Sequence, residues 1–169
     1  MKTTVGVSDL KVSDNPREEL ITYALGSCLG VSLYDPVAMV GGLLHVMLPL
    51  SKADPGKAVL RPAMYVDTGF SQLLNSCYDF GATKKNMVVV VAGGASMKNG
   101  QSTDYFKIGQ RNFTILRKLL WKNGFIIAAQ DVGGVISRTM MLRMSDGLVT
   151  INKKPFYQHE RIRSGTYGP

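Results

Sequence analysis

The feature that most constrains the fold is a pair of apolar runs, residues 29–34 and 39–48, separated by a few residues that begin Asp35-Pro36. Proline holds its own φ at roughly −65°, and aspartate hydrogen-bonds the backbone two residues further on, so this dipeptide favours a tight turn. The runs are bounded by turn residues and have the length of strands. The segment is therefore predicted to form a β-hairpin.

The turn geometry sets which residues face each other across this hairpin. If residues 35–38 form a four-residue loop built on a type I turn, Tyr34 pairs with Met39. Continuing the same register places Cys28 directly opposite His45, and directly opposed residues hold their Cβ atoms roughly 4.5 to 5.5 Å apart. A thiol and an imidazole are therefore expected within contact distance.

Strand alternation predicts which face of the hairpin carries the sulfur. One face holds Leu29, Val31 and Leu33, and the other holds Cys28, Gly30, Ser32 and Tyr34. The second face is less apolar and has room near Gly30, so the sulfur is expected on an accessible side. A bulge at Gly41-Gly42 would shift the register by one residue and reverse this facing, and that alternative stays open.

The remaining chain alternates strand and helix patterns. Further strands are predicted where short apolar runs are bounded by turn residues, at 3–7, 20–25, 87–92, 125–130, 135–143 and 148–152. Two amphipathic helices are predicted within residues 62–80 and at about 110–123, each with apolar residues at helical spacing and a glycine beyond its end. These elements predict an α+β fold, layered as two main helices on an extensive sheet.

Length and composition favour a single domain. The chain has 169 residues, and 45% of them are hydrophobic, which is ample for a core. Residues 1–152 are predicted to form the domain, and residues 153–169 a basic, loosely held tail. The longest apolar window, residues 37–50, is shorter than the roughly 20 residues that span a bilayer, and no apolar signal segment is evident at the N-terminus. A cytoplasmic protein without membrane insertion is expected.

The formal net charge of +8 suggests nucleic-acid binding as one hypothesis. Such binding needs the charge concentrated on one face or segment, together with a recognisable motif. Residues 152–169 hold Lys153, Lys154, Arg161 and Arg163 against Glu160. The rest of the chain has no basic run interleaved with aromatic residues and no zinc-finger or RNP-like pattern. No nucleic-acid partner is therefore expected.

Two cysteines and two histidines limit the possible metal and disulfide chemistry. A chain of this size does not need a disulfide framework, so free thiols are expected. Cys77 lies on the apolar stripe of the first predicted helix and is expected in the core, and His159 is expected to be solvated in the tail. A zinc site needs three or four ligands with closely paired spacing. A zinc site is therefore not expected.

Cys28 and His45 have the residue types of a nucleophile and its base. An imidazole beside a thiol can take its proton and hold the resulting thiolate as an ion pair, which makes a nucleophile for acyl transfer. The small residues Gly26 and Ser27 could let backbone N–H groups face a developing oxyanion. Thr22, on the preceding strand, could orient the imidazole through its hydroxyl. A structural role stays open, because free cysteines are often buried and inert.

These residues belong to an ordered set of short motifs that spans nearly the whole chain. The set comprises LGSCLGVSLYDP at 25–36, GGLLHVMLP at 41–49, YVD at 65–67, GGASM at 93–97, IGQRN at 108–112, and DVGG at 131–134 with Arg138. It closely resembles the CheD family of chemoreceptor glutamine deamidases.

The resemblance implies a reaction and a role for three residues. Cys28 would be the nucleophile, His45 the general base and acid, and Thr22 the residue that orients His45. The enzyme would hydrolyse selected glutamine side chains of methyl-accepting chemotaxis receptors to glutamate and ammonia, without a cofactor. The resemblance also implies an α/β/β sandwich similar to the deamidase domain of cytotoxic necrotizing factor toxins.

Two other functions remain as alternatives. The family also pairs with a CheC-type phosphatase of the response regulator CheY, so the chain could act chiefly as a regulatory binding partner with catalysis secondary. A thiol amidase for a small molecule would need a deep specificity pocket. The complete Cys-His-Thr set favours the receptor deamidase.

Overall fold

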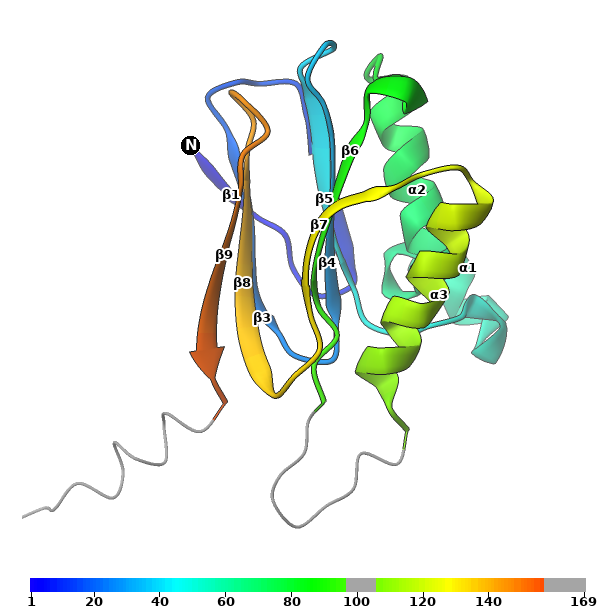
Figure 1. Ribbon diagram of the computed structural model, residues 1–169. Coiled ribbons are helices and arrows are strands. Elements are labelled where there is room, and N and C mark those ends of the chain that lie inside the picture. Colours follow the sequence, from blue (N-terminus) through cyan, green and yellow to red (C-terminus); the bar gives the residue numbers. More distant parts are fainter. Residues whose placement is uncertain (97–105, 157–169) are drawn as a thin grey trace, which may run out of the picture.

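The computed structural model describes residues 1–96 and 106–156, which form three layers (Figure 1). A four-stranded sheet is one outer layer, a five-stranded sheet is the middle layer, and helices cover the other face of the five-stranded sheet. The predicted α+β class, with two main helices packed against a sheet, is confirmed.

Strands that are consecutive in the sequence do not always lie side by side, and the two sheets exchange strands along the chain. The four-stranded sheet has the order β1 (Lys2–Thr4), β3 (Glu19–Leu25), β8 (Ile136–Arg143), β9 (Val149–Pro155). The five-stranded sheet has the order β2 (Asp9–Ser13), β5 (Val40–Val46), β4 (Leu29–Asp35), β6 (Val88–Gly93), β7 (Ile127–Val132). The helices are α1 (Pro55–Leu60), α2 (Val66–Asp79) and α3 (Ile108–Lys122), with short 3₁₀ segments at Ser51–Ala53, Pro62–Met64 and Lys84–Asn86.

The core between the helices and the five-stranded sheet is built from apolar side chains. β4 turns alternate residues toward the helices, as its predicted alternation requires, and they meet the apolar stripes of α2 and α3. Its buried members include Leu29, Val31, Leu33, Phe70, Leu73, Leu116 and Leu120. Burying each such side chain stabilises the fold by roughly 1.5 to 3 kcal/mol. This layer holds the five-stranded sheet in place under the site.

The core between the two sheets includes polar residues as well as apolar ones. Leu20, Leu43 and Met140 are buried there. Thr22 of β3 and His45 of β5 are joined across the same interface and are also almost fully buried. Buried polar side chains cost free energy unless they are hydrogen-bonded, so this interface is where a functional site is most readily recognised.

Two elements of the fold were not expected from the sequence. In β2, Leu10 and Val12 pack against the core while Lys11 between them is exposed, which is the alternation of an edge strand. The charged residues Asp9 and Lys11 made this pattern hard to recognise in the sequence. Helix α1 has only six residues, too few to show helical periodicity.

The predicted tail began at residue 153, but Lys153 and Lys154 lie within β9. Residues 157–169, including His159, lie outside the described part of the chain. Within the described residues, no helix is long and apolar enough to cross a membrane.

Candidate active site

The hairpin of β4 and β5 forms as predicted, but its register differs. His45 lies directly opposite Gly30, so the predicted pairing of His45 with Cys28 is wrong. Asp35 pairs with Val40, which starts the loop one residue later than predicted. Moving the loop by one residue displaces each pairing by two positions. Because strand side chains alternate with a period of two, the predicted facing of His45 relative to β4 is preserved.

The side chain of Asp35 explains the displaced loop. Its Oδ1 accepts hydrogen bonds from the N–H groups of Val37 and Ala38, at 2.8 and 3.0 Å, which closes the turn around the end of β4. Met39 completes the turn in the left-handed region, with φ of 57°. The pairing of β4 with β5 continues without a bulge through Gly41-Gly42, so the alternative register is not adopted.

The face of the hairpin that carries Gly30 is covered by the four-stranded sheet, which corrects the expectation of an accessible face. A Cβ added at Gly30 would lie 2.8 Å from Leu25 and 2.9 Å from Met140, so the predicted room beside this glycine is filled. Ser32 on the same face is also buried. Cys28 precedes β4, packs against the inter-sheet core and is half-buried.

Thr22 and His45 meet between the two sheets. Oγ1 of Thr22 lies 2.7 Å from Nδ1 of His45, and both side chains are buried. The pairing of β3 with β8 is interrupted after Thr22 by an irregularity, where Ala24 has a φ of 56°. A bulge changes which side chains face inward, so Leu25 also reaches the inter-sheet core. The sequence-based association of Thr22 with His45 thus has a direct structural counterpart.

A second hydrogen bond of Thr22 determines the tautomer of His45. The Thr22 hydroxyl donates to the carbonyl oxygen of Val5 at 2.8 Å, and a hydroxyl has only one proton to donate. Its contact with Nδ1 must then be one in which Nδ1–H donates to the hydroxyl oxygen. Nε2 of the neutral ring is consequently unprotonated and able to accept a proton. No side-chain pattern pointed to Val5, because it acts through its backbone.

Burial moves both candidate reactive groups toward their neutral forms. Burial raises the pKa of the Cys28 thiol, against a smaller opposing effect of its own backbone N–H. Burial lowers the pKa of His45 to about 4. At neutral pH these shifts favour a thiol and a neutral imidazole over a thiolate–imidazolium pair. No hydrogen bond joins the Cys28 thiol to His45 in this structure.

The three residues Gly26, Ser27 and Cys28 are held by hydrogen bonds to their carbonyl oxygens. The carbonyls of Gly26 and Cys28 accept from the N–H groups of Ala95 and Gly94, both at 2.8 Å. The carbonyl of Ser27 accepts from Nδ2 of Asn112 at 3.0 Å. We call residues 26–28 the cysteine loop. Because each of its carbonyls has a partner outside the loop, its backbone conformation is strongly determined.

Glycines make this close packing around the cysteine loop possible. Gly93 has a φ of 107°, and a Cβ there would lie only 2.2 Å from the carbonyl oxygen of Cys28. A Cβ at Gly109, in the first turn of α3, would lie 2.3 Å from the carbonyl oxygen of Ala95. The GGASM and IGQRN motifs therefore bring the end of β6 and the start of α3 against the cysteine loop.

Asn112 is the site residue whose role the sequence reasoning missed. It is completely buried, and its Nδ2 donates both to Ser27 and to the carbonyl oxygen of Met47 at 3.0 Å. It thereby links the cysteine loop to the residue that follows β5. The signal was present in the sequence, because Asn112 lies on the same helical stripe as Leu116 and Leu120, where a polar side chain is unexpected.

Two buried polar atoms at this site have no hydrogen-bond partner. Among the described residues, only Nε2 of His45 and Oδ1 of Asn112 are buried side-chain nitrogen or oxygen atoms without one. Unpartnered buried polar atoms are rare in folded proteins and mark places where function competes with stability. Asn112 contacts the cysteine loop and the residue after β5, and His45 lies near the end of β5 itself.

Arg138 forms hydrogen bonds with two residues of the DVGG motif. Its guanidinium is buried and contacts Asp131, with Nε 3.0 Å from Oδ1, and it donates to the carbonyl oxygen of Gly133 at 2.9 Å. Lys153 contacts the other oxygen of Asp131 at 2.7 Å. Hydrogen bonds from Lys153 and Arg138 hold the pKa of Asp131 below its usual value, despite the opposing effect of burial. This cluster fixes the turn between β7 and β8.

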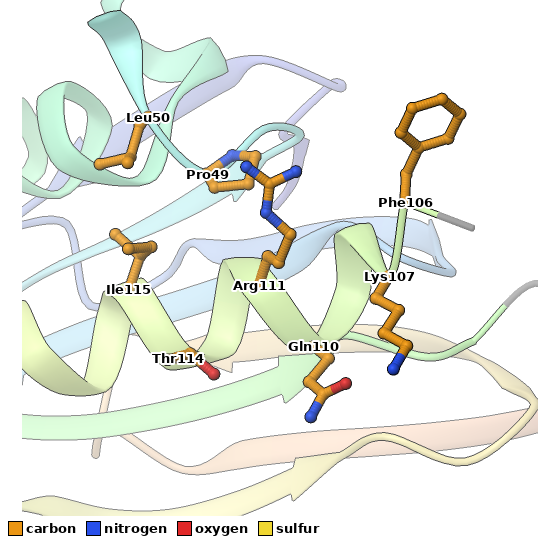
Figure 2. Close-up of a pocket in the computed structure, with 8 residues that line it drawn as sticks. All are labelled: Pro49, Leu50, Phe106, Lys107, Gln110, Arg111, Thr114 and Ile115. Carbon is orange, nitrogen blue, oxygen red and sulfur yellow. The ribbon is translucent and has the colours of Figure 1, made fainter. Parts of the chain in front are cut away.

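A groove of about 610 Å³ lies beside the first turns of α3 (Figure 2). Its lining includes Pro49 and Leu50, which follow β5, together with Gln110 and Arg111 of α3. In Figure 2 the Arg111 side chain extends toward Pro49. Because α3 also carries Asn112, the groove lies beside the elements that hold the cysteine loop.

The other cysteine has the predicted core position. Cys77 is completely buried in α2, and burial raises the pKa of its thiol to about 12. Both cysteines are free. No group of three or more His, Cys, Asp or Glu side chains placed to bind a metal ion occurs within residues 1–96 and 106–156.

Comparison with known proteins identifies the family. Residues 47–153 match the family described as "CheD chemotactic sensory transduction". The chain is 48% identical over 147 residues to the "Probable chemoreceptor glutamine deamidase CheD 1" of Syntrophus aciditrophicus, covering 87% of this chain and 91% of that protein. It is 46% identical over 143 residues to the protein named "Probable chemoreceptor glutamine deamidase CheD" in Solibacter usitatus, covering 85% and 83%.

A more distant relative matches over a similar extent. The "Probable chemoreceptor glutamine deamidase CheD" of Thermococcus kodakarensis is 37% identical over 153 residues, covering 90% of this chain and 93% of that protein. The chain belongs to the CheD family.

Proposed function

We propose that this protein is a chemoreceptor glutamine deamidase in which Cys28 is the nucleophile, His45 the general base and acid, and Thr22 the residue that orients His45. The observation that carries this proposal is the contact between Thr22 and Nδ1 of His45, which leaves Nε2 free to accept a proton. The substrate class comes from the names of the CheD relatives.

The first half of the reaction forms a thioester. Nε2 of His45 takes the proton of the Cys28 thiol as the sulfur attacks the carboxamide carbon of a glutamine side chain. A tetrahedral oxyanion results, and the imidazolium is stabilised by donating Nδ1–H to Thr22. When the C–N bond breaks, Nε2 returns the proton to the departing nitrogen and ammonia leaves. Starting from neutral groups, this proton transfer accompanies attack.

The second half of the reaction releases glutamate. A water molecule loses a proton to Nε2 of His45 and attacks the thioester carbon. The second tetrahedral oxyanion collapses, the C–S bond breaks, and the sulfur of Cys28 recovers the proton from His45. The product is a carboxylic acid that releases its proton to water and becomes the glutamate side chain, and the enzyme returns to its starting state without a cofactor.

Backbone groups of the cysteine loop are the candidates for stabilising both oxyanions. The N–H of Cys28 belongs to the same residue as the attacking sulfur, so it is a candidate donor to the oxygen of the attacked carbon. The N–H of Ser27 is the candidate second donor, and Gly26 leaves space for the approach. Among the described residues, no oxygen accepts a hydrogen bond from the Cys28 N–H.

The surroundings of the site are compatible with a protein substrate. Cys28 is half-buried rather than enclosed, and the basic side chain of Arg111 lines the neighbouring groove. A net charge of +8 would speed encounter with acidic receptor segments by electrostatic steering. The layered arrangement of helices and two sheets also supports the inferred likeness to the deamidase domain of cytotoxic necrotizing factor toxins.

The test is mass spectrometry of a purified receptor cytoplasmic fragment after incubation with the enzyme. The wild type should convert specific glutamines to glutamates, and Cys28→Ala should not. Cys77→Ala is the matched control, because it removes the other thiol from the core without touching the site, and it should retain conversion. Equal conversion by wild type and Cys28→Ala would overturn the catalytic role of Cys28. No conversion by either would favour a regulatory binding role.

A further inference from the structure

We propose that Asn112 is a positioning residue that fixes the Cys28 N–H as an oxyanion donor. The inference rests on the proposed deamidase function and adds a residue to its machinery. It starts from geometry: Nδ2 of Asn112 donates to the carbonyl oxygens of Ser27 and Met47, each at 3.0 Å.

The peptide bond carries the effect of Asn112 to the N–H of Cys28. The carbonyl of Ser27 and the N–H of Cys28 belong to one planar trans peptide unit, in which they point in opposite directions. Holding the carbonyl toward α3 therefore directs the N–H away from α3. The N–H and the attacking sulfur belong to the same residue, so the N–H can reach the oxygen of the carbon that the sulfur attacks. Rotation of this one peptide unit would remove the donor from the site.

The Ser27–Cys28 peptide unit is held by a side chain, whereas the peptide units on either side of it are held by backbone groups. Gly26 and Cys28 carbonyls are bound by the main-chain N–H groups of Ala95 and Gly94. The Ser27 carbonyl has Asn112. A substitution at this position can therefore release one peptide unit while the backbone contacts on both sides remain, which makes the proposal testable.

The burial of Asn112 is consistent with a fixed donor. The side chain is completely buried, and both neighbours of Nδ2 are carbonyl acceptors, so the reverse orientation of the amide would place oxygen against oxygen. Oδ1 has no partner among the described residues. A leucine on this helical stripe would fill the space but would leave the Ser27 and Met47 carbonyls without this donor, so packing alone does not account for an amide here.

The experiment compares full-length wild type, Asn112→Asp and Asn112→Ala in the deamidation of a receptor cytoplasmic fragment. Asn112→Asp keeps the shape but removes the N–H donors, and Asn112→Ala removes the side chain without adding a buried charge. Loss of an oxyanion donor typically lowers kcat about 100-fold, and we expect a fall of that order with KM nearly unchanged. Asn112→Ala keeps the test valid if the aspartate variant does not fold.

Alkylation of Cys28 by iodoacetamide is the second readout, because it uses the same sulfur but forms no oxyanion. We expect its rate to stay within about twofold of wild type at each pH. Asp35→Asn is the control for stability, since it weakens a buried hydrogen-bonded side chain at the other end of β4 and should leave kcat unchanged.

Three outcomes would overturn the role of Asn112. They are a kcat within about threefold of wild type, a parallel loss of kcat and alkylation rate, and an equal loss of kcat in Asp35→Asn. Failure of the proposed function is distinguishable, because Cys28→Ala would then deamidate the fragment as well as wild type does, or wild type itself would not deamidate it.

Discussion

The two ends of the β4–β5 hairpin both bury polar side chains, but they satisfy them differently. At the loop end, the carboxylate of Asp35 accepts hydrogen bonds from backbone N–H groups of its own turn and, at 2.7 Å, from the N–H of Thr83. At the open end, Nε2 of His45 and Oδ1 of Asn112 have no partner among the described residues. At the loop end the carboxylate has its hydrogen-bond partners. At the open end each of two buried side chains keeps an acceptor atom without a donor.

The difference separates a structural polar residue from a reactive one. Hydrogen bonds to a charged group stabilise a fold by roughly 1.5 to 3 kcal/mol, whereas an unpartnered buried polar atom costs about 1 to 3 kcal/mol. Burial would raise the pKa of Asp35, but the N–H groups of Ala38, Thr83 and Val37 outweigh it and the net shift is downward. For His45, burial acts alone and the pKa falls to about 4. The open end is therefore the end that we propose to be reactive.

The largest expected effect is on catalysis at the open end. His45→Gln keeps a polar side chain of similar length but removes the proton acceptor, and we expect kcat for receptor deamidation to fall about 1,000-fold or more. Steady-state ammonia release measures it. A variant that kept more than about a tenth of the wild-type kcat would remove the contrast between the two ends.

The loop end should show the opposite behaviour. Asp35→Ala leaves the N–H groups of its turn and of Thr83 without their acceptor, and we expect a loss of about 3 kcal/mol in the free energy of unfolding. Urea denaturation measures this loss. The kcat of the folded variant should match wild type, and a large fall in kcat would show that both ends contribute to catalysis.

Thr22→Val sharpens the comparison within the open end. The valine has the same shape but cannot accept the Nδ1–H of His45, so the ring loses the contact that sets its tautomer. We expect kcat to fall about 100-fold, which corresponds to roughly 2.7 kcal/mol in the activation free energy. Thr22→Ser should restore most of the activity because it keeps the hydroxyl. Equal activity in the valine and serine variants would contradict the role of the hydroxyl.

The smallest expected effect is on stability as a function of pH. The folded pKa of His45, about 4, lies below the ordinary histidine value of 6.5, so the unfolded state binds more protons between these values. Stability should fall as pH drops below 6.5, with a loss of about 2 kcal/mol between pH 7 and pH 5.

Urea denaturation of wild type and His45→Gln at both pH values isolates this contribution. The lowered pKa values of Asp35 and Asp131 act in a more acidic range, below the usual pKa of a carboxylate, and are shared by both proteins. The variant should lose distinctly less stability than wild type over the interval. Identical pH dependence of the two proteins would mean that His45 is not neutral through burial.

Local patterns predicted the elements of the fold better than their relative positions. The apolar stripes of α2 and α3 and the alternation of β4 were readable because they depend on side chains close in the sequence. The register of the hairpin was not, since it depends on how Asp35 closes its turn. The second sheet that fills the space beside Gly30 comes from distant segments, which no local pattern reveals.

The candidate site was predictable in its residue types but only partly in its geometry. The pairing of Cys28 with His45 was wrong in register, yet Thr22 was associated with the correct histidine. Burial between the two sheets favours neutral forms of Cys28 and His45, and this burial could not be predicted from the sequence. Asn112 was concealed because its role depends on the backbone of a segment far away in the chain.

The most direct test of a reactive, unpartnered imidazole is ¹⁵N NMR of the histidine side chains, with His45→Gln used to assign the His45 signals. At pH 7 the ring should be neutral, with its proton on Nδ1 and Nε2 unprotonated, and it should titrate near pH 4. A proton on Nε2 of a neutral ring, or an imidazolium at pH 7, would contradict the account.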